Sequence, residues 1–388
     1  MKVKENIFYV GTDDKTLDWF EGQYMIPEGI SYNSYVIKDE KITVMDAVDI
    51  RCGDQWLQQV EEVLQGQQPS YLVVLHVEPD HASSVVKFLQ TYKDCQCVTS
   101  AKAQQFLGQF FDYDFSGRFL TIKEGDELSL GTHTLQFMAA PMVHWPEVMV
   151  AYETTEKILF AADGFGKFGA LDGQLYQTTT EGWACEARRY YFNIVGKYGQ
   201  QVQGLLKKAA ALDIKTIAPL HGPILENDLS YYLNLYQIWS SYQAESQGVF
   251  IAYCSLHGHT QQVALELEKL LSEQGVDVAI TDLVRSDMAE AVEDAFRYDR
   301  MVLAAPTYDG GVMPKMEEFL HHLKAKNFRN RKIGIIENGT WAPMAAKTMC
   351  AILEQMNNIT IVEPKVSIRS AMKEADKETL KQLAAAML

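Results

Sequence analysis

The sequence predicts an α/β protein of two domains, a β-rich α/β block over residues 1–247 and a doubly wound parallel sheet over residues 248–388. Length is the first reason, because 388 residues exceed the ~100–200 residues of an ordinary domain. The second reason is the spacing of apolar runs, which are short and turn-separated early and alternate regularly with helical patterns late. The third is the polar segment AESQG at residues 244–248, which separates the two patterns.

The first block consists mainly of short strands joined by turns. β-Branched and aromatic residues gather in short runs bounded by turn residues, and the early and late runs follow one another closely enough for antiparallel hairpins. We expect strands at residues 31–37, 41–47, 71–76, 95–100, 134–140, 147–153, 157–163 and 216–221. Apolar residues at helical spacing predict helices at residues 54–65, 183–211 and 228–245.

The second block alternates strands with helices along its whole length. Successive strand–helix units require right-handed crossovers, so the strands lie parallel and the helices cover both faces of the sheet. We expect strands at residues 249–254, 278–283, 300–307, 332–338 and 360–368. The helices between and after them are expected at residues 260–273, 288–296, 314–325, 342–355 and 373–387.

Composition and charge exclude several classes of function. Apolar residues make up 47% and charged residues 22%, which is ordinary for a chain with a packed core. The net charge of −16 would repel a nucleic acid or an anionic membrane surface, and no apolar run is long enough to span a bilayer. The six cysteines are scattered without a CxxC pair, so we expect free, mostly buried thiols and a cytoplasmic protein.

Potential metal ligands cluster in the segment HVEPDH, residues 76–81, at the end of an apolar run. Residues 76, 78 and 80 alternate, so an extended backbone would point His76, Glu78 and Asp80 the same way, with His81 adjacent. Several ligand-type side chains at one strand end indicate a metal site. The alternative is a polar loop that closes the strand.

Three further apolar runs end in a single ligand-type residue, at His144, Asp163 and His221. Taken alone, each is more often a capping residue or a polar residue in the core. Their shared placement at strand ends indicates that they join the HVEPDH segment in one site. We predict no catalytic residue beyond these metal ligands.

The pattern HxExDH, followed by single His, Asp and His residues at strand ends, resembles the metallo-β-lactamase-like fold, an αββα sandwich, and within it the flavodiiron proteins. Hydrolytic members of that fold typically carry His at the position of Glu78. A carboxylate there adds a hard anionic oxygen and shifts the preference from zinc toward iron. The resemblance implies a non-haem di-iron centre with these ligands: His76, Glu78 and His144 for one iron, Asp80, His81 and His221 for the other, and Asp163 for both.

The first strand of the second block runs into the turn SLHGHT, residues 255–260, and then into a helix. Short hydroxyls and a glycine at a strand-to-helix turn direct backbone N–H groups and a helix N-terminus toward an anion. This turn therefore indicates a phosphate cradle for a mononucleotide, since it has neither the GxGxxG of a dinucleotide fold nor the lysine of a P-loop. The alternative is an ordinary helix cap by Thr260.

Two further loops follow the third and fourth strands, APTYDGG at 305–311 and ENGTWA at 337–342. Both lie at the sheet edge where such folds bind ligands, and Tyr308 and Trp341 offer planar faces for a flavin ring. For Trp341 a packed surface aromatic is the alternative. Together the loops resemble flavodoxin, which implies bound FMN. This chain departs from the flavodoxin pattern in two places. His257 and His259 stand where such loops often carry an aromatic and a polar residue, and the third loop lacks a second Gly before its Trp. The FMN contacts expected are Ser255, Leu256, His257, Gly258, His259, Thr260, Pro306, Thr307, Tyr308, Asp309, Gly310, Gly311, Asn338, Gly339, Thr340 and Trp341.

A lactamase-like di-metal domain followed by a flavodoxin domain resembles the flavodiiron proteins over the whole chain. That family implies reduction of O2 to water, of NO to N2O, or of both, with FMN passing electrons to the irons. It also implies a head-to-tail homodimer or a dimer of dimers, which would bring the sites of two chains together. Because no rubredoxin-type CxxC pair is present, we expect electrons from a separate rubredoxin, reductase or reduced deazaflavin.

Two other functions remain open at this level. The first is a zinc-dependent hydrolase with a fused flavodoxin module, against which Glu78 argues. The second is an electron carrier that uses FMN alone, against which the full set of metal ligands argues. The sequence does not choose between O2 and NO.

Overall fold

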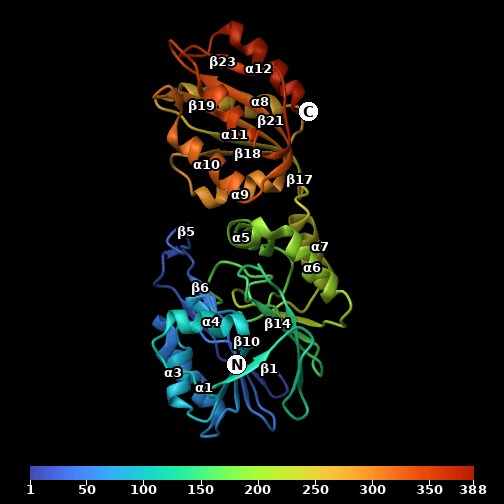
Figure 1. Cartoon of the computed structure of the whole chain (residues 1–388). Helices are drawn as coiled ribbons and strands as arrows, with labels where there is room; N and C mark the ends of the chain where they lie inside the picture. The colour runs from blue at the N-terminus through green and yellow to red at the C-terminus, as the bar shows by residue number, and fades with distance from the viewer. The chain divides into compact units, whose positions relative to one another are not determined.

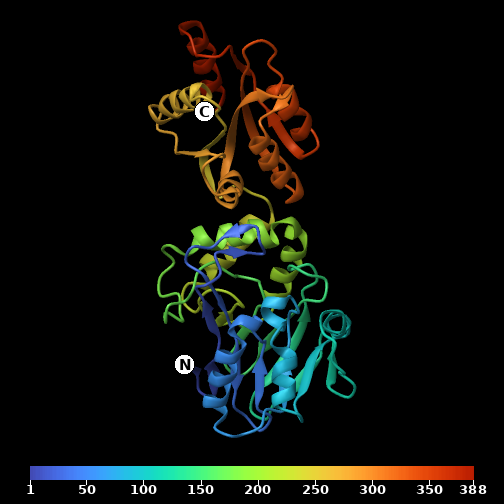
Figure 2. The ribbon, with the colours of Figure 1, turned by 90° about the vertical axis from the view of Figure 1, so that its left-hand side faces the viewer.

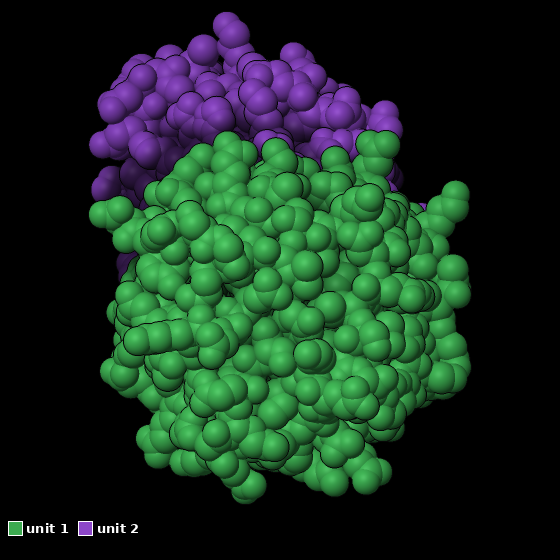
Figure 3. Space-filling model, turned by 60° about the horizontal axis from the view of Figure 1, so that its bottom comes forward, with its two compact units in different colours: residues 1–191, 200–237 green, residues 192–199, 238–388 purple.

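The computed structural model describes residues 1–388 and divides into two compact units, which Figure 3 shows in different colours. Unit 1 comprises residues 1–191 and 200–237, and unit 2 comprises residues 192–199 and 238–388. Residues 192–199 and 238–247 therefore cluster with the C-terminal unit. The domain limit between residues 247 and 248 stays a prediction.

Unit 1 contains two mixed sheets and two further two-stranded sheets (Figure 1). The larger sheet follows the order β1 (Lys2–Lys4), β2 (Ile7–Tyr9), β7 (Tyr35–Ile37), β8 (Thr43–Met45), β9 (Tyr71–Val73), β10 (Gln96–Ser100) and β11 (Phe119–Ile122). The smaller sheet follows β12 (Glu127–Ser129), β13 (Thr134–Ala139), β14 (Met149–Glu153), β15 (Ile158–Phe160) and β16 (Thr216–Ala218). The remaining strands pair as β3 (Thr12–Asp14) with β6 (Ile30–Tyr32) and β4 (Trp19–Phe20) with β5 (Tyr24–Met25).

Helices of this part of the chain bury one face each. In the first of them Trp56, Val60 and Leu64 recur every four residues and are fully buried, and the Trp56 indole N–H donates to Ser34 Oγ at 2.9 Å. The helices are α1 (Gly53–Leu64), α2 (Pro79–Ala82), α3 (Val85–Thr91), α4 (Ala101–Phe110), α5 (Trp183–Tyr190), α6 (Gly199–Ala209) and α7 (Leu229–Ser240).

The single strand predicted at residues 31–37 is wrong, because the chain crosses there from one sheet to another. Residues 30–32 pair with β3, whereas residues 35–37 pair with β2 and β8. Between them the buried Asn33 side chain donates to the carbonyls of Pro219 and Gly222 at 2.8 and 2.7 Å. These tertiary hydrogen bonds hold the crossing in place and cannot be read from local pattern.

The long helix predicted at residues 183–211 is interrupted. After α5 the chain forms a π-helical turn at Tyr191–Val195 and a 3-10 turn at Gly196–Tyr198 before α6 begins. Gly199 lies against the backbone of Ser240, since an added Cβ there would stand 2.3 Å from the Ser240 carbonyl oxygen. Glycine has a low helix propensity, so two glycines within four residues accompany the break.

Unit 2 is a doubly wound sheet with the strand order β18-β17-β19-β21-β22, all parallel. This order places the first strand of the domain between the second and third, which is the flavodoxin-like arrangement. The strands are β17 (Ser246–Tyr253), β18 (Val278–Asp282), β19 (Tyr298–Tyr308), β20 (Gly311–Val312), β21 (Arg329–Asn338), β22 (Asn357–Ile361) and β23 (Val366–Ile368).

Helices cover both faces of this sheet, as Figure 2 shows. α8 contacts α12 on one face, and α10 contacts α9 and α11 on the other. The bounds are α8 (His259–Ser272), α9 (Met288–Arg297), α10 (Pro314–Ala325), α11 (Ala345–Leu353) and α12 (Glu374–Ala386). Each lies within three residues of its predicted position.

The last predicted strand, residues 360–368, is divided in two. β22 and β23 both pair with β21, and the Glu363–Pro364 bond separates them. Proline has no N–H to donate to a ladder, so a continuous strand is excluded there.

No helix of the chain is long and apolar enough to cross a membrane. Cys52, Cys95, Cys97 and Cys254 are buried free thiols, as the sequence predicts.

Candidate functional site

The structure brings all seven predicted metal ligands together inside unit 1. Their backbone positions differ from the simple strand-end expectation, because β9 already ends at Val73 and Pro79 begins the short helix α2. Asp80 and His81 therefore reach the site from the first turn of a helix rather than from an extended strand. The ligands fall into two groups, His76, Glu78, His144 and Asp163 in one and Asp80, His81 and His221 in the other.

In the first group, two imidazoles and two carboxylates converge. Nε2 of His76 lies 3.2 Å from Glu78 Oε2 and 3.2 Å from Asp163 Oδ2. Nε2 of His144 lies 2.9 Å from the same Glu78 oxygen and 3.1 Å from the same Asp163 oxygen. Ligand atoms that sit about 2.0–2.2 Å from one metal ion are themselves spaced at distances of this kind.

The second group is centred on the other oxygen of Asp163. Nε2 of His81 lies 3.2 Å from Asp80 Oδ2 and 3.3 Å from Asp163 Oδ1. Nε2 of His221 lies 3.2 Å from Asp80 Oδ2 and 3.7 Å from Asp163 Oδ1. One carboxylate, Asp163, thus directs Oδ2 to the first group and Oδ1 to the second.

Buried polar atoms without partners show that protein groups alone do not satisfy this cluster. Both carboxylate oxygens of Asp80 and of Asp163 are buried, and their side-chain partners are confined to the imidazoles of the cluster itself. The Nε2 atoms of His81 and His221 face each other at 3.1 Å, so either one imidazole donates an N–H to the other or a cation lies between their lone pairs. The donor set and these unpartnered atoms fit bound metal ions.

The pKa shifts of the candidate ligands indicate a site in which positive charge stabilises the buried carboxylates. Burial alone would lower the pKa of His144, but hydrogen bonds to Asp163 and Glu78 raise it to about 9. Burial alone would raise the pKa of Asp163, but the charge of His76 and hydrogen bonds from His144, His76 and His81 hold it well below its ordinary value. Protons or metal ions must therefore balance the carboxylates.

Two groups outside the ligand set orient the imidazoles, and sequence reasoning missed both. Nδ1 of His76 lies 2.7 Å from Oε1 of Glu147, and Nδ1 of His221 lies 2.7 Å from the carbonyl oxygen of Ser31. Each contact leaves Nε2 directed at the site. Glu147 carries a weak signal, an acidic residue that opens an apolar strand, whereas a backbone carbonyl carries none.

A second site lies in unit 2, where a pocket of about 540 Å³ opens at the carboxyl ends of β17, β19 and β21. Fourteen of the sixteen predicted flavin contacts line it, and Gly258 and Gly311 do not. Ala342, Met344 and Ser370 also line it and were not predicted. The Ser370 amide and carbonyl pair with the Asn338 side chain at 3.1 and 2.8 Å, which places that loop beside the fourth strand.

The hydroxyl and aromatic groups of this pocket have distinct roles. Thr307 Oγ1 accepts hydrogen bonds from the backbone N–H groups of Met344 and Ala345 at 2.8 and 3.2 Å, so it caps the start of α11. Trp341 is 88% exposed and Tyr308 is 44% exposed. The alternative of a packed aromatic does not hold for Trp341, whose ring is available to a planar ligand.

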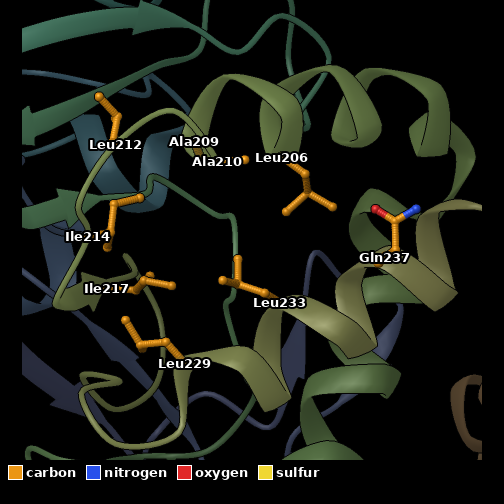
Figure 4. Close-up of a pocket in the computed structure, with 9 residues that line it drawn as sticks. All are labelled: Leu206, Ala209, Ala210, Leu212, Ile214, Ile217, Leu229, Leu233 and Gln237. Carbon is orange, nitrogen blue, oxygen red and sulfur yellow. The ribbon is translucent and has the colours of Figure 1, made fainter.

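A third hollow, of about 370 Å³, lies in unit 1 between α6, α7 and the segment that leads into β16 (Figure 4). Leu206, Leu212, Ile214 and Leu233 direct aliphatic side chains into it, and Gln237 is its one polar side chain. It therefore offers no ligand set for a metal and no group for acid–base chemistry.

Two family models match the chain. The model described as "ODP family beta lactamase" matches residues 30–222, and the model described as "Flavodoxin domain" matches residues 250–381. The solved structure of rubredoxin oxygen:oxidoreductase from Desulfovibrio gigas is similar over 100% of this chain and 97% of that chain, with a TM-score of 0.93 and 25% identity. The chain belongs to the flavodiiron proteins. The predicted fold class, family and oxidoreductase class are thereby confirmed.

Three other proteins are similar to this flavodiiron protein over most of its length. The flavodiiron protein of Giardia intestinalis shares the fold over 98% of this chain and 96% of its own, with a TM-score of 0.88 and 24% identity. An anaerobic nitric oxide reductase flavorubredoxin of Escherichia coli is 27% identical over 360 residues, 91% of this chain and 74% of the relative. A putative diflavin flavoprotein of Nostoc is 30% identical over 84% of this chain, which spans only 56% of that relative's length.

Proposed function

We propose that this flavodiiron protein reduces O2 to water or NO to N2O at two non-haem irons, with electrons delivered through FMN. One observation carries the proposal: the two oxygens of Asp163 face two separate ligand groups, which suits a carboxylate that bridges two metal ions. The assignment of His76, Glu78 and His144 to one iron, and of Asp80, His81 and His221 to the other, remains part of this proposal.

The ligand chemistry favours iron over zinc. Three carboxylates and four imidazoles form a set of hard and intermediate ligands without a thiolate. Two divalent ions bring four positive charges against three carboxylates, which leaves about one positive charge to attract an anionic or polarised oxygen ligand. When bound, the irons supply coordination and reduction of a diatomic molecule, and FMN supplies electrons one at a time.

Tyr190 is a hydrogen-bond donor of this chain whose ring packs against His221 of that centre. It is fully buried, its ring centroid lies 5.6 Å from that of His221, and its hydroxyl has no hydrogen-bond partner. Burial, and then the charges of Asp163 and Asp80, raise the pKa of Tyr190 well above its ordinary value. The hydroxyl therefore stays protonated and can donate to an oxygen atom of the substrate.

FMN fits the pocket of unit 2. The pocket lies where doubly wound sheets bind ligands, its volume of about 540 Å³ suits a mononucleotide, and Ser255 and Thr260 supply hydroxyls beside the N-terminus of α8. Trp341 and Tyr308 supply aromatic faces. The sixteen predicted contacts remain proposals.

The partners are proposed on the family resemblance. We propose a head-to-tail homodimer or a dimer of dimers, a separate electron donor of the rubredoxin, reductase or reduced deazaflavin class, and a cytoplasmic location. The buried free thiols support a reducing compartment.

The test is anaerobic reconstitution with iron and FMN, chemical reduction, and mixing with O2 or NO in parallel. Flavin reoxidation is followed by absorbance, N2O by gas chromatography and hydrogen peroxide by a coupled assay. We expect rapid reoxidation of the flavin. N2O should be the product from NO, and water without hydrogen peroxide should be the product from O2. The variant His81→Asn should keep flavin but lose the formation of N2O from NO and of water from O2, so that any flavin reoxidation left with O2 yields peroxide. His133→Asn changes a buried histidine that pairs with Glu153 at 3.0 Å outside the centre, and it should keep both flavin and gas reduction.

The two alternative functions, a zinc hydrolase and an electron carrier, predict different results in these experiments. Two zinc ions in the purified protein, together with hydrolysis of a thioester or phosphodiester, would establish the hydrolase. Unchanged turnover in His81→Asn would remove the di-iron role and leave an electron carrier.

A further inference from the structure

His81 differs from the two other fully buried imidazoles of the centre in what supports its ring. Nδ1 of His76 lies 2.7 Å from Glu147 Oε1, and Nδ1 of His221 lies 2.7 Å from the carbonyl oxygen of Ser31. Nδ1 of His81 is buried and has no hydrogen-bond partner. A metal-binding imidazole ordinarily donates from its outer nitrogen to a neighbour, and that bond fixes the plane of the ring. The orientation of His81 therefore depends on the groups that pack against it.

Tyr32, the last residue of β6, packs against this ring. Its side chain is fully buried, and its ring centroid lies 6.4 Å from that of His81 at an interplanar angle of 80°. The same ring lies 5.9 Å from that of His221 at 63°. Edge-to-face contacts between rings are favourable and depend on their relative orientation. One phenol ring thus restrains two ligands of the second group.

The hydroxyl of Tyr32 is held by a guanidinium that reaches the surface. Nη2 of Arg51 donates to Tyr32 Oη at 3.1 Å, although the Arg51 side chain is 45% exposed. Nε of Arg51 lies 3.2 Å from Asp14 Oδ2 and 3.1 Å from Asp49 Oδ1. Because two carboxylates hold the guanidinium, its hydrogen bond fixes the outer end of the Tyr32 ring.

We propose that Tyr32 is a positioning residue for His81, that Arg51 holds Tyr32 in place, and that together they raise the affinity of the second ligand group for its metal ion. This role depends on the proposed binding of metal ions by both groups. It applies to Asp80, His81 and His221 only, because neither Tyr32 nor Arg51 has a ring contact or hydrogen bond to a ligand of the first group.

Three variants separate the ring of Tyr32 from its hydrogen bond. Tyr32→Leu removes both and should weaken the second metal site at least about tenfold, as for other outer partners of metal ligands. Tyr32→Phe and Arg51→Gln each remove the hydrogen bond and keep the ring, so each should weaken that site about fivefold, which corresponds to about 1 kcal/mol. The double variant Tyr32→Phe with Arg51→Gln should lose no more than either single variant. Removal of the Arg51 charge alone would favour a cation, so a loss of affinity has the opposite sign to a direct charge effect.

The experiment titrates the metal-free, full-length chain with Co2+ under anaerobic conditions, in competition with a chelator of known affinity. Visible absorption of bound Co2+ gives two stepwise dissociation constants, and Asp80→Asn identifies the constant that belongs to the second group. Tyr152→Phe is the matched control, because Tyr152 is also buried in unit 1 and its hydroxyl donates to the carbonyl of Asp213 at 3.0 Å. Lys157→Gln, which breaks an ion pair with Asp213, is the control for loss of a surface cation. Both controls should leave both constants unchanged.

Several results would overturn the inference. Both constants could stay unchanged in Tyr32→Leu, or both could rise equally, which would indicate a general loss of packing. Additive losses in the double variant would show that Arg51 does not act through the Tyr32 hydroxyl. If Tyr32→Leu does not fold, Tyr32→Phe and Arg51→Gln decide the question by themselves. An unmodified chain that binds fewer than two ions would remove the proposed function first and this role with it, whereas two ions bound equally well by every variant would remove this role alone.

Discussion

Glu147→Gln is the most informative single change, because Glu147 touches a predicted ligand without being one. The Glu147 side chain is 3% exposed, and its Oε1 accepts from His76 Nδ1 at 2.7 Å and from the Val77 amide at 3.1 Å. Glutamine keeps the Oε1 acceptor and the shape of the side chain, and it replaces the charge and the buried, unpartnered Oε2 by an amide NH2. Loss of such an outer partner costs about 10–100-fold in metal affinity, and the retained hydrogen bonds place this variant near tenfold, about 1.4 kcal/mol.

The assay is competition between the chain and a chelator of known affinity, with metal per chain measured by mass spectrometry. Only the ion held by the His76 group should weaken. Glu153→Gln is the matched control, because Glu153 is also buried and its Oε1 lies 3.0 Å from His133 Nδ1 and accepts from the Thr155 amide at 2.8 Å, with no ligand nearby. It should leave both metal affinities unchanged.

Two results would refute this reasoning. Equal metal affinity in Glu147→Gln and the unmodified chain would show that the Glu147 charge does not support His76 as a ligand. Equal losses in Glu147→Gln and Glu153→Gln would show that any buried Glu–His pair acts through general stability instead.

Three further predictions concern the bridging ligand and the framework of unit 2. Asp163→Asn should lower bound metal below two ions per chain while flavin absorbance persists, because both groups lose a charged oxygen; two retained ions would contradict a bridge. Thr307→Val should reduce the free energy of unfolding by about 1–2 kcal/mol in urea titration, as for a lost helix cap, whereas Thr307→Ser should cost little; equal losses would contradict a capping role. Arg331→Met should cost at least about 3 kcal/mol, since the buried guanidinium donates to the carbonyls of Phe296, Tyr298 and Tyr242, and an unchanged thermal midpoint would contradict this.

The sequence by itself determined the elements of unit 2 and which seven side chains are candidate metal ligands. Strands and helices there alternate with a local periodicity that burial on both faces of a parallel sheet imposes, so even α10 was placed at its observed bounds, Pro314–Ala325. The ligand-type residues were recognisable because His76, Glu78, Asp80 and His81 stand together after an apolar run, and because His144, Asp163 and His221 each end one.

Only the tertiary structure decided how those residues meet. The division of Asp163 between two groups depends on the placement of β9, β15 and β16 in two different sheets, which no local pattern encodes. The same holds for Asn33, which holds the crossing between sheets through the carbonyls of Pro219 and Gly222, and for Glu147, which supports His76 from 71 residues away. Periodicity reports what each segment buries, whereas contacts between distant segments depend on the packing of the whole unit, and the support of a metal site consists of such contacts.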